Sequence, residues 1–94
     1  MARIQTQKYY IDYKIEDGIV ILDMLQVKNE HRNKGIAIKA MQSFINKFKG
    51  RTIELHAYPQ DNTTTLDKLV NFYEKFGFDV VCGSELSGYE MKIN

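Results

Sequence analysis

Residues 32–37 combine residue types that bind anions. The segment carries two cationic side chains, Arg32 and Lys34, and has Gly35 where helical apolar spacing begins. The first turn of a helix exposes unpaired backbone N–H groups with about half a positive charge, which favours a phosphate group there. Gly35 and the small Ala37 let the backbone approach a ligand closely. These features predict a pyrophosphate site; the alternative is an ordinary strand-to-helix turn with a glycine near the helix start.

Positive charge is concentrated around this segment. The formal net charge is only +1 over 94 residues, which gives no reason to expect binding to nucleic acid or to an anionic membrane. Between Glu30 and Glu54, however, there is no acidic residue. The basic residues in that interval are Arg32, Lys34, Lys39, Lys47, Lys49 and Arg51. We assign the first two to the anion site, whereas the last three fit a solvated helix face equally well.

Hydrophobic periodicity predicts the elements that position this segment. In residues 9–15, apolar or aromatic residues alternate with mostly polar ones, which predicts a half-buried strand. Asp17-Gly18, which follows, is typical of a tight hairpin turn. Ile19–Val27 is apolar at nearly every position, which indicates a strand covered on both faces. The other predicted elements are a helix over 36–48 ended by Gly50, a strand over 52–57, a helix over 66–76 with Thr64 and Asp67 as capping pair and Gly77 at its end, and strands over 78–82 and 89–93.

The predicted order is therefore β-β-α-β-α-β-β, an α/β (α+β) fold with one mixed sheet and two packed helices. The strands at 19–27 and 52–57 should be parallel, because a helix connects them, and antiparallel pairing is expected at both chain ends. The length leaves room for a single domain, residues 1–94.

Two patterns resemble the GNAT superfamily of N-acetyltransferases. Arg32-x-x-Gly35-x-Ala37 resembles the family signature Q/R-x-x-G-x-G/A, and it follows a hydrophobic strand and opens an amphipathic helix, as in the family. The segment FYEKFGF at 72–78 resembles the family's Y-E-K-x-G-F segment. The resemblance spans residues 19–81 and implies a GNAT-like fold, acetyl-CoA as cofactor, and acetyl transfer to an amine.

The resemblance also implies which residues hold the cofactor. Backbone N–H groups of the turn would bind the pyrophosphate of coenzyme A; the turn residues are Arg32, Asn33, Lys34, Gly35, Ile36 and Ala37. The backbone of Leu25, Gln26 and Val27 would pair with the pantetheine arm, and the Val27 N–H would polarise the thioester carbonyl. The two parallel strands would splay apart to admit the cofactor.

Two departures from the family pattern limit this inference. The family often has an asparagine that contacts pantetheine where this chain has Leu66, and Asn62 is a candidate substitute. Members also carry an acceptor-binding helical region before the central hairpin, but here only a short segment precedes the first predicted strand. Either a partner subunit supplies that wall, or the acceptor site is open and suits a large or macromolecular amine.

For catalysis, the resemblance implies that Tyr73 is the general acid that protonates the departing thiolate. The alternative is a core role, because Tyr73 lies on the apolar stripe of its helix. Asp23 is the odd residue in an apolar strand, and a desolvated carboxylate there would serve as general base. Glu54, His56 and ordered water are the other candidates for the base.

Three functions remain open at this point. The leading one is an N-acetyltransferase that moves acetyl from acetyl-CoA to a primary amine by direct attack in a ternary complex, since no residue of the recognised site is an activated nucleophile. The others are a non-catalytic acyl-CoA-binding module or regulatory subunit, and an interaction protein without coenzyme A. The acceptor is a small molecule or a protein, a homodimer is possible, and we predict no metal site.

The remaining features concern the cell compartment. Cys82 is the one cysteine, which excludes an intramolecular disulfide and is typical of a reducing cytosol. Because it follows an apolar run, we predict a small buried hydrophobic residue. No segment resembles a signal peptide or a membrane span, so we expect a cytoplasmic protein.

Overall fold

The computed structural model describes residues 2–28, 35–59 and 64–93. Its elements are β1 (Ala2–Gln5), β2 (Tyr9–Glu16), β3 (Ile19–Val27), α1 (Ile36–Lys47), β4 (Ile53–Ala57), α2 (Leu66–Glu74), β5 (Asp79–Ser84) and β6 (Gly88–Ile93). The predicted order is confirmed, with β1 as an additional strand at the N-terminal end. None of the described helices is long and apolar enough to cross a membrane.

All the strands form one mixed sheet in the order β1-β2-β3-β4-β6-β5. β3 and β4 are parallel, and every other neighbouring pair is antiparallel, as the sequence predicted for the two chain ends. β1 escaped prediction because its residues are mostly exposed and do not alternate. It is held to β2 by a short ion pair between Arg3 Nε and Asp12 Oδ1 at 2.6 Å, and the Arg3 guanidinium lies 4.2 Å from the centroid of the Tyr10 ring.

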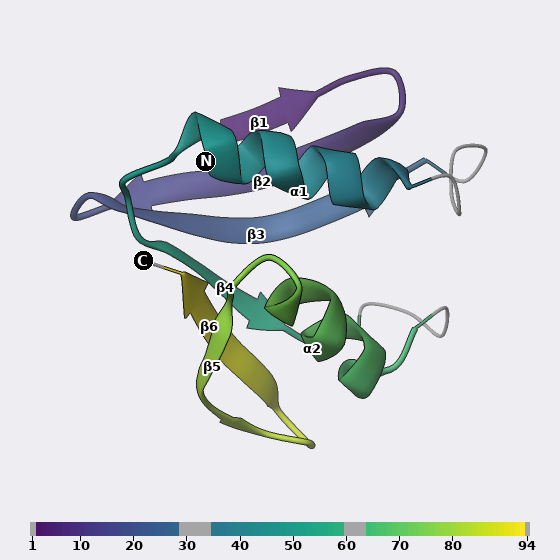
Figure 1. Cartoon of the computed structure of the whole chain (residues 1–94), viewed down its shortest axis with the longest axis vertical. Coiled ribbons are helices and arrows are strands. Elements are labelled where there is room, and N and C mark those ends of the chain that lie inside the picture. The colour runs from purple at the N-terminus through teal and green to yellow at the C-terminus, as the bar shows by residue number, and fades with distance from the viewer. Residues whose placement is uncertain (1, 29–34, 60–63, 94) are drawn as a thin grey trace.

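Both helices cover the same face of this sheet (Figure 1). Alternate side chains of the central strands point into a single core that α1 and α2 close, as expected from strand geometry. The buried residues are Ile11, Val20, Leu22, Ala40, Met41, Phe44, Phe48, Ile53, Leu55, Ala57, Phe78 and Met91. In this core the Phe44 ring packs edge-on against Tyr13 and Phe48, with centroid distances of 5.6 and 5.1 Å.

The opposite face of the sheet is polar. Within the residues that the structure describes, no helix covers it. Alternation places Glu54 and His56 of β4 on this face, next to Glu90 and Lys92 of β6. In the part of the chain that the structure describes, the fold is therefore a two-layer arrangement, with both helices on one face of the sheet.

The glycines predicted at the helix ends lie there in the structure, but the predicted N-cap of the second helix does not. Gly35 begins α1 in the left-handed region at φ 73°, and Gly77 ends α2 at φ 96°. Gly77 belongs to a Schellman motif, because its N–H bonds to Glu74 O and the next N–H, of Phe78, bonds to Tyr73 O. The predicted capping pair of Thr64 and Asp67 is wrong: the N-cap is Thr65, whose side chain accepts a hydrogen bond from the Lys68 N–H at 3.3 Å.

The prediction for Cys82 is also wrong. Cys82 is exposed, because β5 is the edge strand of the sheet and is solvent-accessible along its whole length. Its thiol donates a hydrogen bond to Glu90 Oε2 at 3.2 Å, and this bond raises the pKa of Cys82. The apolar run that contains Cys82 does not distinguish an edge strand from a central one.

Candidate active site

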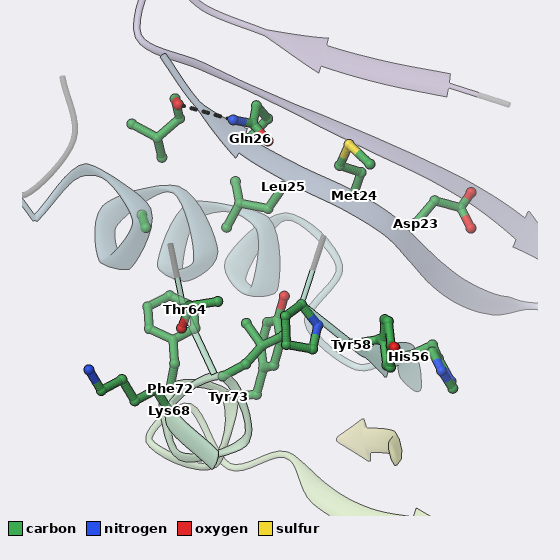
Figure 2. Close-up of a pocket in the computed structure, with 14 residues that line it drawn as sticks. Asp23, Met24, Leu25, Gln26, His56, Tyr58, Thr64, Lys68, Phe72 and Tyr73 are labelled. Atoms are coloured by element: carbon green, nitrogen blue, oxygen red, sulfur yellow. Dashed lines mark hydrogen bonds between the residues drawn. The ribbon is translucent and has the colours of Figure 1, made fainter. Parts of the chain in front are cut away.

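A groove opens where the parallel strands β3 and β4 part. Their pairing covers only Val20–Leu22 against Ile53–Leu55, although β3 runs on to Val27 and β4 to Ala57. The groove between the diverging ends has a volume of about 390 Å³. Its lining residues are Asp23, Met24, Leu25, Gln26, Val27, Ala37, His56, Tyr58, Pro59, Thr64, Lys68, Leu69, Phe72 and Tyr73 (Figure 2).

A β-bulge in β3 lies at the point of divergence. Tyr13 pairs with Leu22 and Asp12 with Met24, so Asp23 is an extra residue opposite β2. A bulge bends its strand and increases the local twist. The bulge therefore coincides with the point where β3 leaves β4, and it places Asp23 at the mouth of the groove.

Backbone groups of β3 form one wall of the groove. The Lys28 N–H donates to Lys8 O at 2.9 Å and so points toward β2. Since successive backbone groups of a strand point to alternate edges, those of Val27 and Leu25 point away from β2, toward the groove, whereas those of Gln26 point to β2. The Gln26 side chain lines the groove instead, and its Nε2 donates to Val27 O at 3.5 Å (Figure 2).

The N-terminus of α1 forms a second wall. Ala37, in its first turn, lines the groove, and that turn has no acidic residue and no side-chain cap. The first N–H groups of the helix, at Ile36 and Ala37, therefore retain their positive partial charge. Gly35 precedes them with its backbone in the left-handed region. The predicted turn residues Arg32, Asn33 and Lys34 lie outside the described residues.

Tyr73 projects from α2 into the groove. Its ring packs edge-on against Phe72 and Phe78, with centroid distances of 5.4 and 5.9 Å. Figure 2 shows the side chain rising from α2 toward β3. Burial raises the pKa of Tyr73 to about 12, because the phenolate would lose its hydration there. The hydroxyl therefore keeps its proton at neutral pH and is a hydrogen-bond donor within the groove.

Asp23 reaches the groove but is exposed. The prediction that this carboxylate is desolvated is therefore wrong. The pKa of Lys14 is raised mainly by its hydrogen bond to Glu16, with an electrostatic contribution from Asp23. Asp23 is thus a hydrated anionic group at the mouth of the groove.

The sequence did not identify several other lining residues, among them Met24, Tyr58, Lys68 and Phe72. Phe72 belongs to the segment at 72–78 that resembles the family pattern, but no role was predicted for it. Helical spacing alone does not distinguish an aromatic residue that lines a groove from one that lies in the core. Leu66 is half-buried and is not among the lining residues. Asn62 lies outside the described part of the chain.

The comparisons with known proteins decide the family. The family model described as an acetyltransferase (GNAT) domain matches residues 2–80. This chain belongs to the GNAT acetyltransferases. The fold and the two sequence patterns agree with that membership.

Solved structures add detail. The anti-CRISPR protein AcrVA5 superimposes with a TM-score of 0.75 at 28% identity, and the match covers 99% of this chain and 97% of that one. The PaiA N-acetyltransferase of Thermoplasma acidophilum, solved with coenzyme A, has a TM-score of 0.69 at 24% identity and a match covering 90% of this chain and 52% of that one. The ribosomal-protein-S18-alanine N-acetyltransferase of Escherichia coli has a TM-score of 0.72 at 13% identity, covering 96% and 64%.

This GNAT domain therefore spans 52% to 64% of the length of the two acetyltransferases described, but nearly all of the anti-CRISPR protein. No curated protein sequence matches the chain.

Coenzyme A is the cofactor of this family, and the groove fits it. The groove offers a backbone edge at Leu25 and Val27 for an extended amide-containing arm. It also offers the positive end of α1, next to Ala37, for phosphate groups. The two features lie on adjoining walls of one groove, as a ligand with both chemical parts requires.

Proposed function

We propose that this protein transfers an acetyl group from acetyl-CoA to a primary amine by direct attack within a ternary complex. The observation that carries the proposal is the position of Tyr73. A protonated, partly buried hydroxyl projects into a groove whose other walls suit coenzyme A. The bound cofactor would supply an acetyl thioester, and the residues of the chain would orient it and manage the protons.

Orientation would come from the two walls. The N–H groups of residues 32–37 would hold the pyrophosphate, and the β3 edge at Leu25 and Val27 would pair with the pantetheine arm. The Val27 N–H points to the groove side of β3, where it would donate to the thioester carbonyl and stabilise negative charge there. Gln26 and Asn62 stay predicted cofactor contacts, Gln26 through its side chain.

Tyr73 would donate the proton that the leaving thiolate takes up. A tyrosine is protonated at neutral pH with or without this shift, so the Tyr73 hydroxyl is available as a donor when the thiolate forms. Asp23 remains a predicted group on the acceptor side. Its exposed carboxylate at the groove mouth would attract an ammonium group.

The acceptor is proposed to be an amine on a macromolecule. The sheet face opposite the helices is uncovered in the described chain, so a large acceptor meets no wall there. The nearly full-length match to an anti-CRISPR protein supports the same idea and suggests a component of a CRISPR system as acceptor.

An acetyl-CoA consumption assay across amine classes tests this function. The acceptors would be lysine peptides, N-terminal amines, a polyamine, an aminoglycoside and a purified CRISPR nuclease, with thiol release as readout and mass spectrometry to locate the acetyl group. We expect release with at least one protein amine. Coenzyme A binding without transfer to any acceptor would instead support the non-catalytic binding module.

A further inference from the structure

The groove is one of two hollows that meet at His56. The second is a depression of about 270 Å³ on the helix-free face of the sheet. It is lined by Ile21, Glu54, Leu55, His56, Val81, Glu90, Met91 and Lys92. Among the residues that the structure describes, only His56 is common to the two linings. His56 therefore borders both the groove and the depression on the helix-free face.

The imidazole is held in a defined orientation. His56 Nε2 lies 2.8 Å from the backbone oxygen of Ser87. A carbonyl oxygen only accepts hydrogen bonds, so Nε2 carries the proton, and the neutral ring has its lone pair on Nδ1. The Ser87 backbone is itself fixed, because its N–H donates to Ser84 Oγ at 3.1 Å.

Gly88 makes this orientation possible. It is buried and has a φ of 85°. A Cβ at this position would lie 2.9 Å from His56 Nε2 and 2.6 Å from Ala57 O. The ring therefore packs against backbone that only a glycine leaves open. Ser87, in the turn between β5 and β6, and Gly88, the first residue of β6, thus position a side chain of β4.

The charges around His56 favour the approach of a cationic group. Glu54 precedes His56 on the same face of β4, and Glu90 lies directly opposite His56 on β6. The Glu90 carboxylate also accepts a hydrogen bond from the Cys82 thiol. The other titratable groups that line the two hollows are Asp23 on β3, Lys92 on β6, Tyr58 after β4, and Lys68 and Tyr73 on α2. The carboxylates outnumber the ammonium groups on the helix-free side, which suits the approach of an ammonium group.

We propose that the acceptor amine enters from the helix-free face and gives its proton to Nδ1 of His56. The inference rests on the proposed acetyl transfer and adds the proton acceptor and the direction of approach. An ammonium group loses one proton to Nδ1, and the neutral amine then forms the C–N bond at the thioester carbonyl carbon. As the C–S bond breaks, the leaving sulfur takes the proton of Tyr73, and the second proton that the nitrogen loses restores the Tyr73 phenol. The preferred acceptor is a lysine side chain on a protein surface, since the carboxylates of Glu54 and Glu90 on that face attract its ammonium group.

Two substitutions separate this role from a structural one. His56→Gln retains an N–H donor near the Nε2 position for Ser87 O but has no basic nitrogen, whereas His56→Ala loses both. The experiment measures kcat/KM for acetyl transfer to a lysine peptide from about pH 6 to 9.5, together with the Kd for coenzyme A, on the full chain. We expect both variants to lose about 10²-fold at neutral pH, the range typical of general-base catalysis. The loss should shrink as pH rises, because the free amine then arrives already deprotonated.

The outcomes are distinct. If His56→Gln behaves as wild type and only His56→Ala is impaired, the hydrogen bond to Ser87 matters and the base proposal is overturned. The same conclusion follows if the loss in both variants is independent of pH. A wild-type protein that binds coenzyme A but acetylates no amine overturns the proposed function itself and this inference with it.

Discussion

At the scale of single residues, the chemistry of the groove depends on where each polar atom is held. The Tyr73 ring packs between aromatic neighbours, and burial raises the pKa of its hydroxyl to about 12. The His56 ring has one tautomer because a carbonyl oxygen lies at Nε2. A donor and an acceptor of protons thus line the same groove. Acetyl transfer to an ammonium group requires both, since one proton is removed and another is supplied.

Tyr73→Phe tests the donor. We expect kcat to fall by about 10²-fold, as for loss of a general acid, with no change in the Kd for coenzyme A. Because the pKa of Tyr73 is raised to about 12, the wild-type rate should show no decline from ionisation of this group at moderately alkaline pH. Steady-state thiol release across pH, with calorimetry for Kd, measures both.

Tyr13→Phe is the matched control for that experiment. Tyr13 is a half-buried tyrosine whose ring packs against Phe44 and Phe48, outside the groove. The substitution Tyr13→Phe should leave kcat unchanged. Equal rates for Tyr73→Phe and wild type would remove Tyr73 from its proposed role and support a core function.

At the scale of elements, the site depends on two interruptions of regular structure. One is the bulge at Asp23, where β3 leaves β4. The other is the left-handed Gly35, which turns the chain so that the N-terminus of α1 meets the groove. The bulge turns the β3 edge toward the groove, and Gly35 brings the first N–H groups of α1 to it. Those backbone groups suit binding of an extended, phosphate-bearing cofactor.

Gly35→Ala tests the second interruption. At φ 73° a Cβ meets no atom within 4 Å, so the effect comes from backbone strain of about 1–2 kcal/mol. We expect that loss in the free energy of unfolding, measured by urea denaturation, together with weaker binding of coenzyme A.

Gly18→Ala provides the control. Gly18, in the turn between β2 and β3, has a similar φ of 79° and the same open surroundings. It should lower stability by a comparable amount and leave the Kd for coenzyme A unchanged. If both variants weaken binding equally, general destabilisation accounts for the effect and the N-terminus of α1 is not a binding wall.

At the scale of the whole molecule, one core joins both helices to the sheet, and one face of the sheet is open. The buried residues form a single cluster that extends from β2 to β6. Such a core predicts that residues 1–94 unfold as one cooperative unit. No described helix covers the other face, where we propose that a large acceptor approaches and where a homodimer could form.

Calorimetry of the whole chain checks this prediction. We expect one transition with equal calorimetric and van't Hoff enthalpies. Coenzyme A at about 100 times its Kd should stabilise the fold by about 2.7 kcal/mol, which raises Tm by on the order of 10 °C for a chain of this size. Two resolved transitions would contradict a single domain, and an unchanged Tm would argue against the cofactor site.

The sequence determined the order of the elements, and it predicted where the cofactor site lies. Periodicity and turn residues such as Asp17-Gly18 and Gly77 act locally, so they are readable without the fold. The location of the cofactor site followed from a glycine at a helix start and from a family resemblance. The errors arose where a local signal was ambiguous: Thr64 and Thr65 are both suitable caps, and β1 is too short and exposed to show alternation.

Only the tertiary structure decided what depends on contacts between distant segments. Cys82 lies in an apolar run, yet it is exposed because its strand is at the sheet edge. The groove exists because the pairing of β3 with β4 stops at Leu22, and the sequence of neither strand specifies that point. His56 is oriented by a carbonyl oxygen that follows it by 31 positions. Residue types fix local geometry, whereas exposure, strand divergence and side-chain orientation are set by neighbours that only the folded chain brings together.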